Sequence, residues 1–129
     1  MTRQFLRWMR KTELTEPALC SAVAEMANGL IDADLGGGVV KKRVAMPGRG
    51  KSASTRTLLA TNRASRWFFV FGFEKSERSN VTGKEVEALQ RLAADLLRLS
   101  PSQLDAHVES DALKEICHDN PSQTRKQNS

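Results

Sequence analysis

Tyrosine is absent from the sequence, and aromatic residues account for only 5% of its 129 residues. A reaction step that needs a phenol is therefore excluded. The sequence has only two cysteines, Cys20 and Cys117, which are too few and too far apart along the chain to indicate a disulfide framework or a metal site. We expect both thiols to be reduced.

Histidines and long apolar segments are also scarce. His107 and His118 lie late in the chain without a carboxylate at ligand spacing, so we predict no metal and no cofactor. No local signature of a Ser–His or Cys–His hydrolase surrounds any serine or cysteine. No segment approaches the roughly 20 apolar residues of a membrane span, and the N-terminal MTRQFLRWMRK lacks the apolar run of a signal peptide. The sequence predicts a cytoplasmic protein without a membrane partner.

Positive charge is concentrated in the middle of the chain, although the formal net charge is only +5. Between Leu35 and Phe73 there are eight basic residues and no Asp or Glu, whereas the rest of the chain has 12 basic and 15 acidic residues. Solvated surfaces usually mix both signs, so this segment favours a polyanionic partner, with an ordinary solvated face as the alternative. The eight residues are Lys41, Lys42, Arg43, Arg49, Lys51, Arg56, Arg63 and Arg66.

The first half of the chain predicts two helices followed by strands. Phe5 and Trp8 begin an apolar helical face, and Thr15 is placed to cap a second helix that ends near Gly29. IDADLGGG then breaks the helical pattern. The segments VVKKRVAM, TRTLLATN and SRWFFVFGF are typical of strands, and we place the aromatic third one in the middle of an antiparallel sheet.

The second half predicts two more helices. Thr82 and Glu85 form a capping-box pattern, and Ser100 with Gln103 repeats it before a short final helix. DALKEIC is a candidate edge strand. The fold class is therefore α+β, with N-terminal helices packed on a three- to four-stranded antiparallel sheet that is followed by a C-terminal helix. We expect a single domain over residues 1–117 and a disordered tail over residues 118–129.

The segment GRGKS ends like a phosphate-binding loop. That motif requires a glycine five positions before Gly50, where this chain has Ala45, and it requires a helix afterwards. The residues that follow predict a strand instead. We therefore reject a nucleotide-binding loop.

The basic residues cluster around the predicted sheet. Lys41, Lys42 and Arg43 lie on one strand, and because side chains alternate along a strand, Lys42 points away from the other two. A second group follows the aromatic strand, and an antiparallel sheet brings both groups to one region. A surface that only binds nucleic acid remains the alternative to a catalytic one. The first group also contains Arg49, Lys51 and Arg56. The second group comprises Lys75 and Arg78 together with the polar residues Glu77 and Asn80.

KKRVAMPGRGKSASTRTLLA followed by WFFVFGFEKSERSN resembles the RelE-like toxins of bacterial type II toxin–antitoxin systems, in the branch related to HigB toxins. The resemblance runs from about Phe5 to about Ile116, and several motifs occur in one order. It implies a ribosome-associated mRNA endoribonuclease that inhibits translation without a metal. It also implies a cognate antitoxin as partner, of the helix-turn-helix type that is common beside HigB-like toxins.

The resemblance also implies roles for individual residues. Arg56 resembles the strand arginine that holds the scissile phosphate, and Arg78 resembles another active-site arginine. Lys51 and Lys75 are candidates for charge stabilisation or proton transfer. Glu77 is predicted either to orient an arginine or to form a salt bridge. RNA-backbone contacts are predicted for Lys41, Lys42, Arg43 and Arg49.

The chain departs from this branch at one loop. Similar toxins carry two glycines and an aromatic residue where this chain has Ala53, Ser54 and Thr55. The change removes a ring that would stack on a base or pack on a strand. Two alternatives therefore accompany the nuclease prediction. One is a non-enzymatic, ParE-like toxin that binds a protein target, and the other is a decayed toxin that only binds RNA.

Overall fold

The computed structural model describes residues 1–45 and 55–117. It has helices at both ends of the described chain and an antiparallel sheet between them, as predicted. The strands lie in the order β1-β2-β3-β4 and comprise β1 (Ala33–Gly36), β2 (Val39–Val44), β3 (Thr55–Thr61) and β4 (Trp67–Glu74). The predicted tail of residues 118–129 lies outside the described residues.

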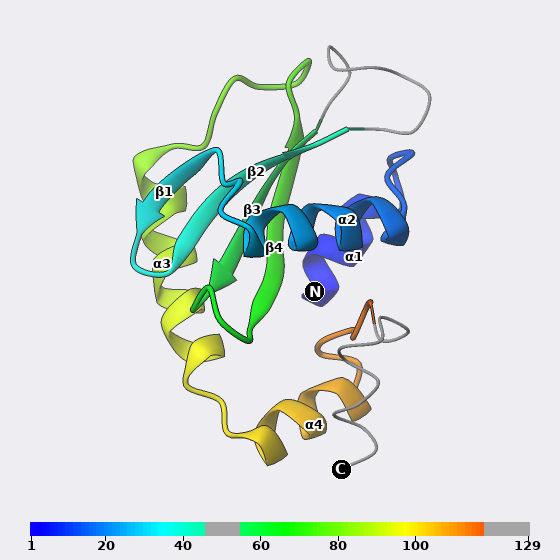
Figure 1. Ribbon diagram of the computed structural model, residues 1–129, viewed down its shortest axis with the longest axis vertical. Helices are drawn as coiled ribbons and strands as arrows, with labels where there is room; N and C mark the ends of the chain where they lie inside the picture. The colour runs from blue at the N-terminus through cyan, green and yellow to red at the C-terminus, as the bar shows by residue number, and fades with distance from the viewer. Residues whose placement is uncertain (46–54, 118–129) are drawn as a thin grey trace.

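Two helices cover one face of the sheet (Figure 1). Helix α1 (Arg3–Met9) packs on β4, and α2 (Glu16–Ala27) packs on β2. The predicted cap of α2 is confirmed, since the side chain of Thr15 accepts a hydrogen bond from the amide of Ala18. The core on this face joins Phe5 and Leu19 of the helices to Val40 and Leu59 of the strands.

The opposite face is covered by α3 (Gly83–Leu97), and α4 (Pro101–Glu109) follows it (Figure 1). Both helices begin with the predicted capping boxes, at Thr82 and at Ser100. The core here joins Leu89 and Ala93 of α3 to Leu58 of β3. The sheet is therefore buried on both faces where α3 covers it.

The aromatic strand is at the edge of the sheet and not in its middle, so that prediction was wrong. Its burial comes from helices rather than from strands on both sides. Phe69 packs against Phe5 of α1, with the ring centroids 5.3 Å apart. The amide of Thr2 donates to the carbonyl of Phe69, at a distance of 3.1 Å, which protects part of the exposed edge.

The structure contains one strand that we did not predict, and it lacks one that we did. The segment IDADLGGG contains β1, which pairs with β2 through a turn in which Gly36, Gly37 and Gly38 all have positive φ angles. DALKEIC does not form a strand: it contributes a single bridge between Leu113 and Thr2. The reason is that its partner residues lie just before α1 and are too few to extend a ladder.

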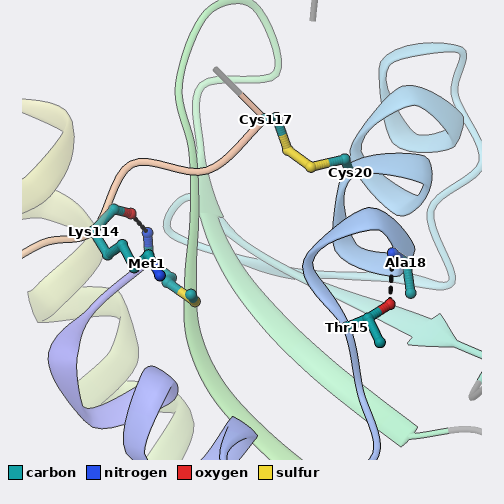
Figure 2. The surroundings of a disulfide bond; sticks show 6 residues. All are labelled: Met1, Thr15, Ala18, Cys20, Lys114 and Cys117. Carbon is teal, nitrogen blue, oxygen red and sulfur yellow. Dashed lines mark hydrogen bonds between the residues drawn. A yellow bond between two sulfur atoms is a disulfide. The ribbon is translucent and has the colours of Figure 1, made fainter. Parts of the chain in front are cut away.

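The two cysteines form a disulfide, which overturns the prediction of two reduced thiols (Figure 2). Cys20 on α2 and Cys117 have Cα atoms 5.6 Å apart although 97 positions separate them in the sequence. We call residues 111–117 the C-terminal strap, since they return across the N-terminal residues to α2. Met1 and Lys114 exchange two backbone hydrogen bonds of 2.7 and 2.8 Å along the way. Sequence distance was therefore a poor guide to distance in the fold.

Candidate functional site

Two rows of side chains cross β2, β3 and β4 on the face that α3 packs against. In the first row Arg43 lies opposite Arg56, and Arg56 lies opposite Phe73. In the second row Lys41 lies opposite Leu58, which lies opposite Phe71. Neighbouring strands are about 4.8 Å apart, so each row spans roughly 10 Å. We call Lys41, Arg43, Arg56 and Arg78 the basic face.

Arg78 joins both rows from the segment after β4. Its guanidinium carbon lies 5.8 Å from the ring centroid of Phe71 and 5.7 Å from that of Phe73, in cation–π contact with both. The aromatic strand therefore supplies a platform for a cation, in addition to packing the core. Arg78 consequently lies at the β4 end of both rows.

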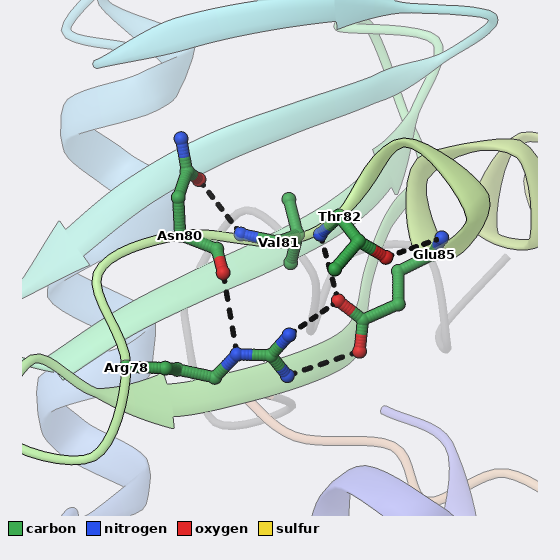
Figure 3. Close-up of polar contacts among 5 residues, drawn as sticks. All are labelled: Arg78, Asn80, Val81, Thr82 and Glu85. Carbon is green, nitrogen blue, oxygen red and sulfur yellow. Dashed lines mark hydrogen bonds and ion pairs between the residues drawn. The ribbon is translucent and has the colours of Figure 1, made fainter.

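The position of Arg78 is fixed by polar contacts with the start of α3 (Figure 3). Its Nη1 donates to Oε2 of Glu85 at 3.0 Å and its Nη2 to Oε1 at 2.5 Å, while its Nε donates to the carbonyl of Asn80 at 3.2 Å. These hydrogen bonds lower the pKa of the Glu85 carboxyl below its ordinary value, with the Arg78 side chain as the largest cause and the Thr82 amide as the next. The carboxyl of Glu85 is therefore charged at neutral pH.

Asn80 connects the two groups of basic residues. Its side-chain oxygen accepts from the amide of Val81 at 2.9 Å and from the Lys41 ammonium at 3.5 Å (Figure 3 shows the first of these). Arg43 is bound to the residue just before β1, Asp32, whose carboxylate accepts from the Arg43 amide at 2.6 Å and forms an ion pair with its guanidinium at 3.4 Å. The Arg43 side chain is still 60% exposed. Lys41 and Arg56 are half-buried.

Lys42 lies on the opposite face of the sheet, as the alternation of side chains predicted. It is buried, and its ammonium forms an ion pair with Glu25 at 2.8 Å and donates to the carbonyl of Leu30 at 2.9 Å. Both partners come from α2 and the segment after it. A groove of about 360 Å³ between α2 and β2 is lined in part by Lys42, Glu25 and Ser21. Lys42 therefore ties α2 to the sheet and does not join the basic face.

The remaining predicted residues differ in how the structure places them. Lys75 is exposed in the turn after β4. Glu77 accepts a hydrogen bond from the amide of Glu74, at 3.4 Å, and so closes this turn. The carboxylate that orients an arginine is Glu85, which the sequence presented only as a capping residue. Arg49 and Lys51 lie outside the described residues.

Thr55 occupies the position at which the sequence resemblance implied an aromatic residue. It is fully buried, and its hydroxyl donates to the carbonyl of Val44 at 3.1 Å. Because Arg56 is on the basic face, Thr55 points to the opposite one. A ring at this position would pack between the sheet and the N-terminal helices and would not stack on a base. At Thr55 the departure therefore changes packing on the face opposite the basic one, whereas Ala53 and Ser54 lie outside the described residues.

Other kinds of site find no support in the described parts of the chain. β3 follows the GRGKS segment, where a phosphate-binding loop would need a helix. Within residues 1–45 and 55–117, no three His, Cys, Asp or Glu side chains are grouped so that they could hold a metal ion. His107 receives its contact from its own helix, through Nδ1 and the carbonyl of Gln103 at 2.7 Å. No helix in these residues is long and apolar enough to cross a membrane.

Comparison with known families gives one match. The family model described as the RelE toxin of the RelE/RelB toxin–antitoxin system matches residues 1–116. The chain belongs to the RelE toxin family. Neither the curated proteins nor the solved structures contain a match to the chain.

Membership of the RelE family confirms the resemblance that the sequence suggested and accounts for nearly the whole described chain. This RelE-family protein is thus the toxin of a toxin–antitoxin pair, and an antitoxin is its partner. The sequence alone placed all four members of the basic face among the candidate site residues of this toxin. They missed Glu85 and Asp32, the two acidic residues that hold Arg78 and Arg43. The only available signal for Glu85 was an opposite charge seven positions after Arg78.

Proposed function

We propose that this RelE-family toxin is an endoribonuclease that cleaves mRNA on the ribosome and thereby inhibits translation. The observation that carries the proposal is the direct cross-strand pair of Arg43 and Arg56, with Arg78 beyond it. Guanidinium groups bind phosphate oxygens through charge-assisted hydrogen bonds, so a face on which arginines lie opposite each other suits an anion such as the phosphates of RNA.

The proposed reaction uses the RNA as its own nucleophile. The 2′-oxygen of one nucleotide forms a bond to the adjacent phosphorus, and the bond from phosphorus to the 5′-oxygen breaks. The proton of the 2′-hydroxyl passes to a base, and the leaving 5′-oxygen takes up a proton. Negative charge builds on the two non-bridging oxygens in the phosphorane, where arginine donors stabilise it. This scheme needs no metal ion or cofactor.

Roles follow from where the side chains lie. Arg56 and Arg78 hold the non-bridging oxygens through charge-assisted hydrogen bonds, which for Arg78 come from the donors that Glu85 and Asn80 leave. Lys41 and Arg43 contact the backbone of the flanking nucleotides. The candidates for proton transfer or charge stabilisation are Lys51 and Lys75, an exposed residue three positions before Arg78. Arg49 is a further backbone contact. Lys42 is left out of this set because it is bound to Glu25.

Partners and location complete the proposal. Ribosome-bound mRNA is the substrate, and the antitoxin, a helix-turn-helix protein in this proposal, covers the basic face with acidic or apolar segments. The complex would then repress its own operon. The compartment is the cytoplasm, where mRNA and ribosomes are found.

Two rivals make different predictions. A ParE-like toxin binds a protein target and needs no basic face, so it would arrest growth without cutting RNA. A decayed toxin binds RNA in a salt-dependent manner and yields no cleavage products. The burial of Thr55 away from the basic face argues against decay through this residue.

Inducible expression in bacteria that lack the antitoxin tests the proposal. Wild type is compared with Arg56→Ala and with Arg63→Ala, a matched control whose arginine pairs with Asp34 on the surface at 2.7 Å. Growth arrest with new mRNA 5′ ends, both lost only in Arg56→Ala, supports the nuclease. Arrest without new ends supports the ParE-like rival. A folded product that causes no arrest supports decay.

A further inference from the structure

Glu85 takes part in two interactions that require different chemistry. Its Oε1 accepts from the amide of Thr82 at 2.8 Å, which is the capping-box contact, and both of its oxygens accept from Arg78. Figure 3 shows the carboxylate between the guanidinium and the first turn of α3. A capping box alone would use only the first contact.

The protein contains an internal comparison for this point. At α4, the amide of Ser100 donates to Oε1 of Gln103 at 2.9 Å, in the same capping-box geometry. A neutral amide at this position is therefore sufficient to cap a helix in this fold. The negative charge of Glu85 is needed only for the paired contact with Arg78.

The contacts of Arg78 orient its guanidinium and still leave donors that can bind a ligand. A guanidinium has five N–H donors, and Glu85 and Asn80 together accept from three of them. Phe71 and Phe73 hold the group from the side of the sheet. Two donors remain without a partner among the described residues. An arginine held in this way needs no rearrangement before it binds a phosphate.

We infer that Glu85 is a positioning residue that holds Arg78 in the orientation in which its remaining donors bind the scissile phosphate. The inference rests on the proposed nuclease function and extends it to a residue outside the basic face. Glu85 itself does not touch the RNA. It acts through Arg78, and it couples the start of α3 to the site.

The test compares three variants of the full chain. Glu85→Gln keeps the capping contact, as Gln103 does at α4, and loses the charge. Thr82→Ala removes the other half of the capping box, the Thr82 hydroxyl that accepts from the Glu85 amide at 3.2 Å, and keeps the pair with Arg78. Glu87→Gln removes a charge from the same helix at an exposed residue whose nearest basic partner is Arg91, 3.9 Å away.

Two measurements are made on each variant. NMR of the Arg78 side chain reports whether its terminal nitrogens rotate slowly, as expected in wild type, Thr82→Ala and Glu87→Gln, or rapidly, as expected in Glu85→Gln. Single-turnover cleavage of ribosome-bound mRNA reports the rate constant and the half-saturating toxin concentration separately. We expect Glu85→Gln to lower the rate constant by about 10- to 100-fold, with a smaller change in half-saturation, and the two controls to stay within about twofold.

Three results would overturn the inference. Arg78 rotating as slowly in Glu85→Gln as in wild type would show that other contacts hold it. Equal losses of rate in Thr82→Ala and Glu85→Gln would assign the effect to fraying of α3. Faster cleavage by Glu85→Gln would make Glu85 an inhibitory partner. A wild type that rotates slowly and cleaves nothing would instead refute the nuclease function while supporting the restraint of Arg78 by Glu85.

Discussion

Lys41 and Lys42 are neighbours in the sequence, yet the sheet directs them to different environments. Lys41 lies on the basic face and contacts Asn80, whereas Lys42 is buried against Glu25 and Leu30 on the other face. The sequence predicted the alternation but not its consequence, because nothing in the residues KKR says which face a helix will cover. Charge alone therefore could not separate a nucleic-acid contact from a structural ion pair.

Replacing each lysine by methionine should separate these roles. Lys42→Met should lower the free energy of unfolding by about 1–3 kcal/mol, because the Leu30 carbonyl loses its donor, with RNA affinity unchanged. Lys41→Met should change stability by less than about 0.5 kcal/mol and reduce the salt dependence of RNA binding by about 0.7 in slope. Denaturant unfolding and RNA titrations at several salt concentrations measure both quantities. A loss of salt slope in Lys42→Met would contradict this assignment.

Glu85 makes a pH-dependent contribution to stability. Its pKa is lower in the folded protein than its ordinary value of 4.5, so its charged form stabilises the fold above that pH. This stabilisation disappears as the pH falls through the folded-state pKa. We therefore expect wild type to be more stable than Glu85→Gln by a constant amount from pH 7 to about 5.5, and the gap to close below pH 4.5. Denaturant unfolding across this range measures the gap, and a gap that persists unchanged to pH 3 would argue against the charged pair.

Helix α1 packs closely on strand β4 where the Trp8 ring lies against Gly72. A Cβ atom added at Gly72 would lie 2.3 Å from Cζ3 of Trp8, which is too close for any side chain. Gly72→Ala should therefore destabilise the protein by about 1–3 kcal/mol through overpacking. The double variant Gly72→Ala with Trp8→Leu should recover part of this loss, since the smaller side chain leaves room. Thermal unfolding measures both variants, and an additive loss in the double variant would show that Trp8 is not the obstacle.

Helices and strands differ in how well the sequence predicts them. The starts of α1 to α4 follow from local chemistry, because a capping side chain such as Thr15 or Thr82 bonds an amide three residues ahead. The position of β4 at the edge depends on distant residues: Phe5 and Thr2 bury it, and neither is near it in sequence. The same limitation hid β1, whose pairing depends on three consecutive glycines with positive φ.

At the scale of the whole molecule, the chain ends are held together by the C-terminal strap. The disulfide between Cys20 and Cys117 closes a loop of 97 residues, and Lys114 adds an ion pair with Glu16 at 2.9 Å. Closing a loop of this length stabilises a fold by up to about 4–5 kcal/mol, mainly by restricting the unfolded chain. Segregation of charge was visible in the sequence, but this closure was not, since it depends on the path of the strap.

Reduction of this disulfide should lower the stability of the whole domain. We expect a thiol reductant to move the denaturant midpoint of wild type downward by an amount that corresponds to a few kcal/mol. The matched control is Cys20→Ser, which should already be less stable and should not respond to the reductant. A wild-type midpoint that is the same with and without reductant would show that the strap is held by its other contacts.

We propose that the basic face cleaves RNA through the 2′-hydroxyl of the substrate. The most direct measurement uses purified toxin, ribosomes programmed with a defined mRNA, and the same mRNA carrying a single 2′-deoxynucleotide on the 5′ side of the cleavage site. We predict cleavage of the first RNA to a 5′-hydroxyl fragment and a 2′,3′-cyclic phosphate, no cleavage of the second, and no cleavage of either by Arg56→Ala. Cleavage of the deoxy-substituted RNA, or products that carry a 5′-phosphate, would contradict attack by the 2′-hydroxyl.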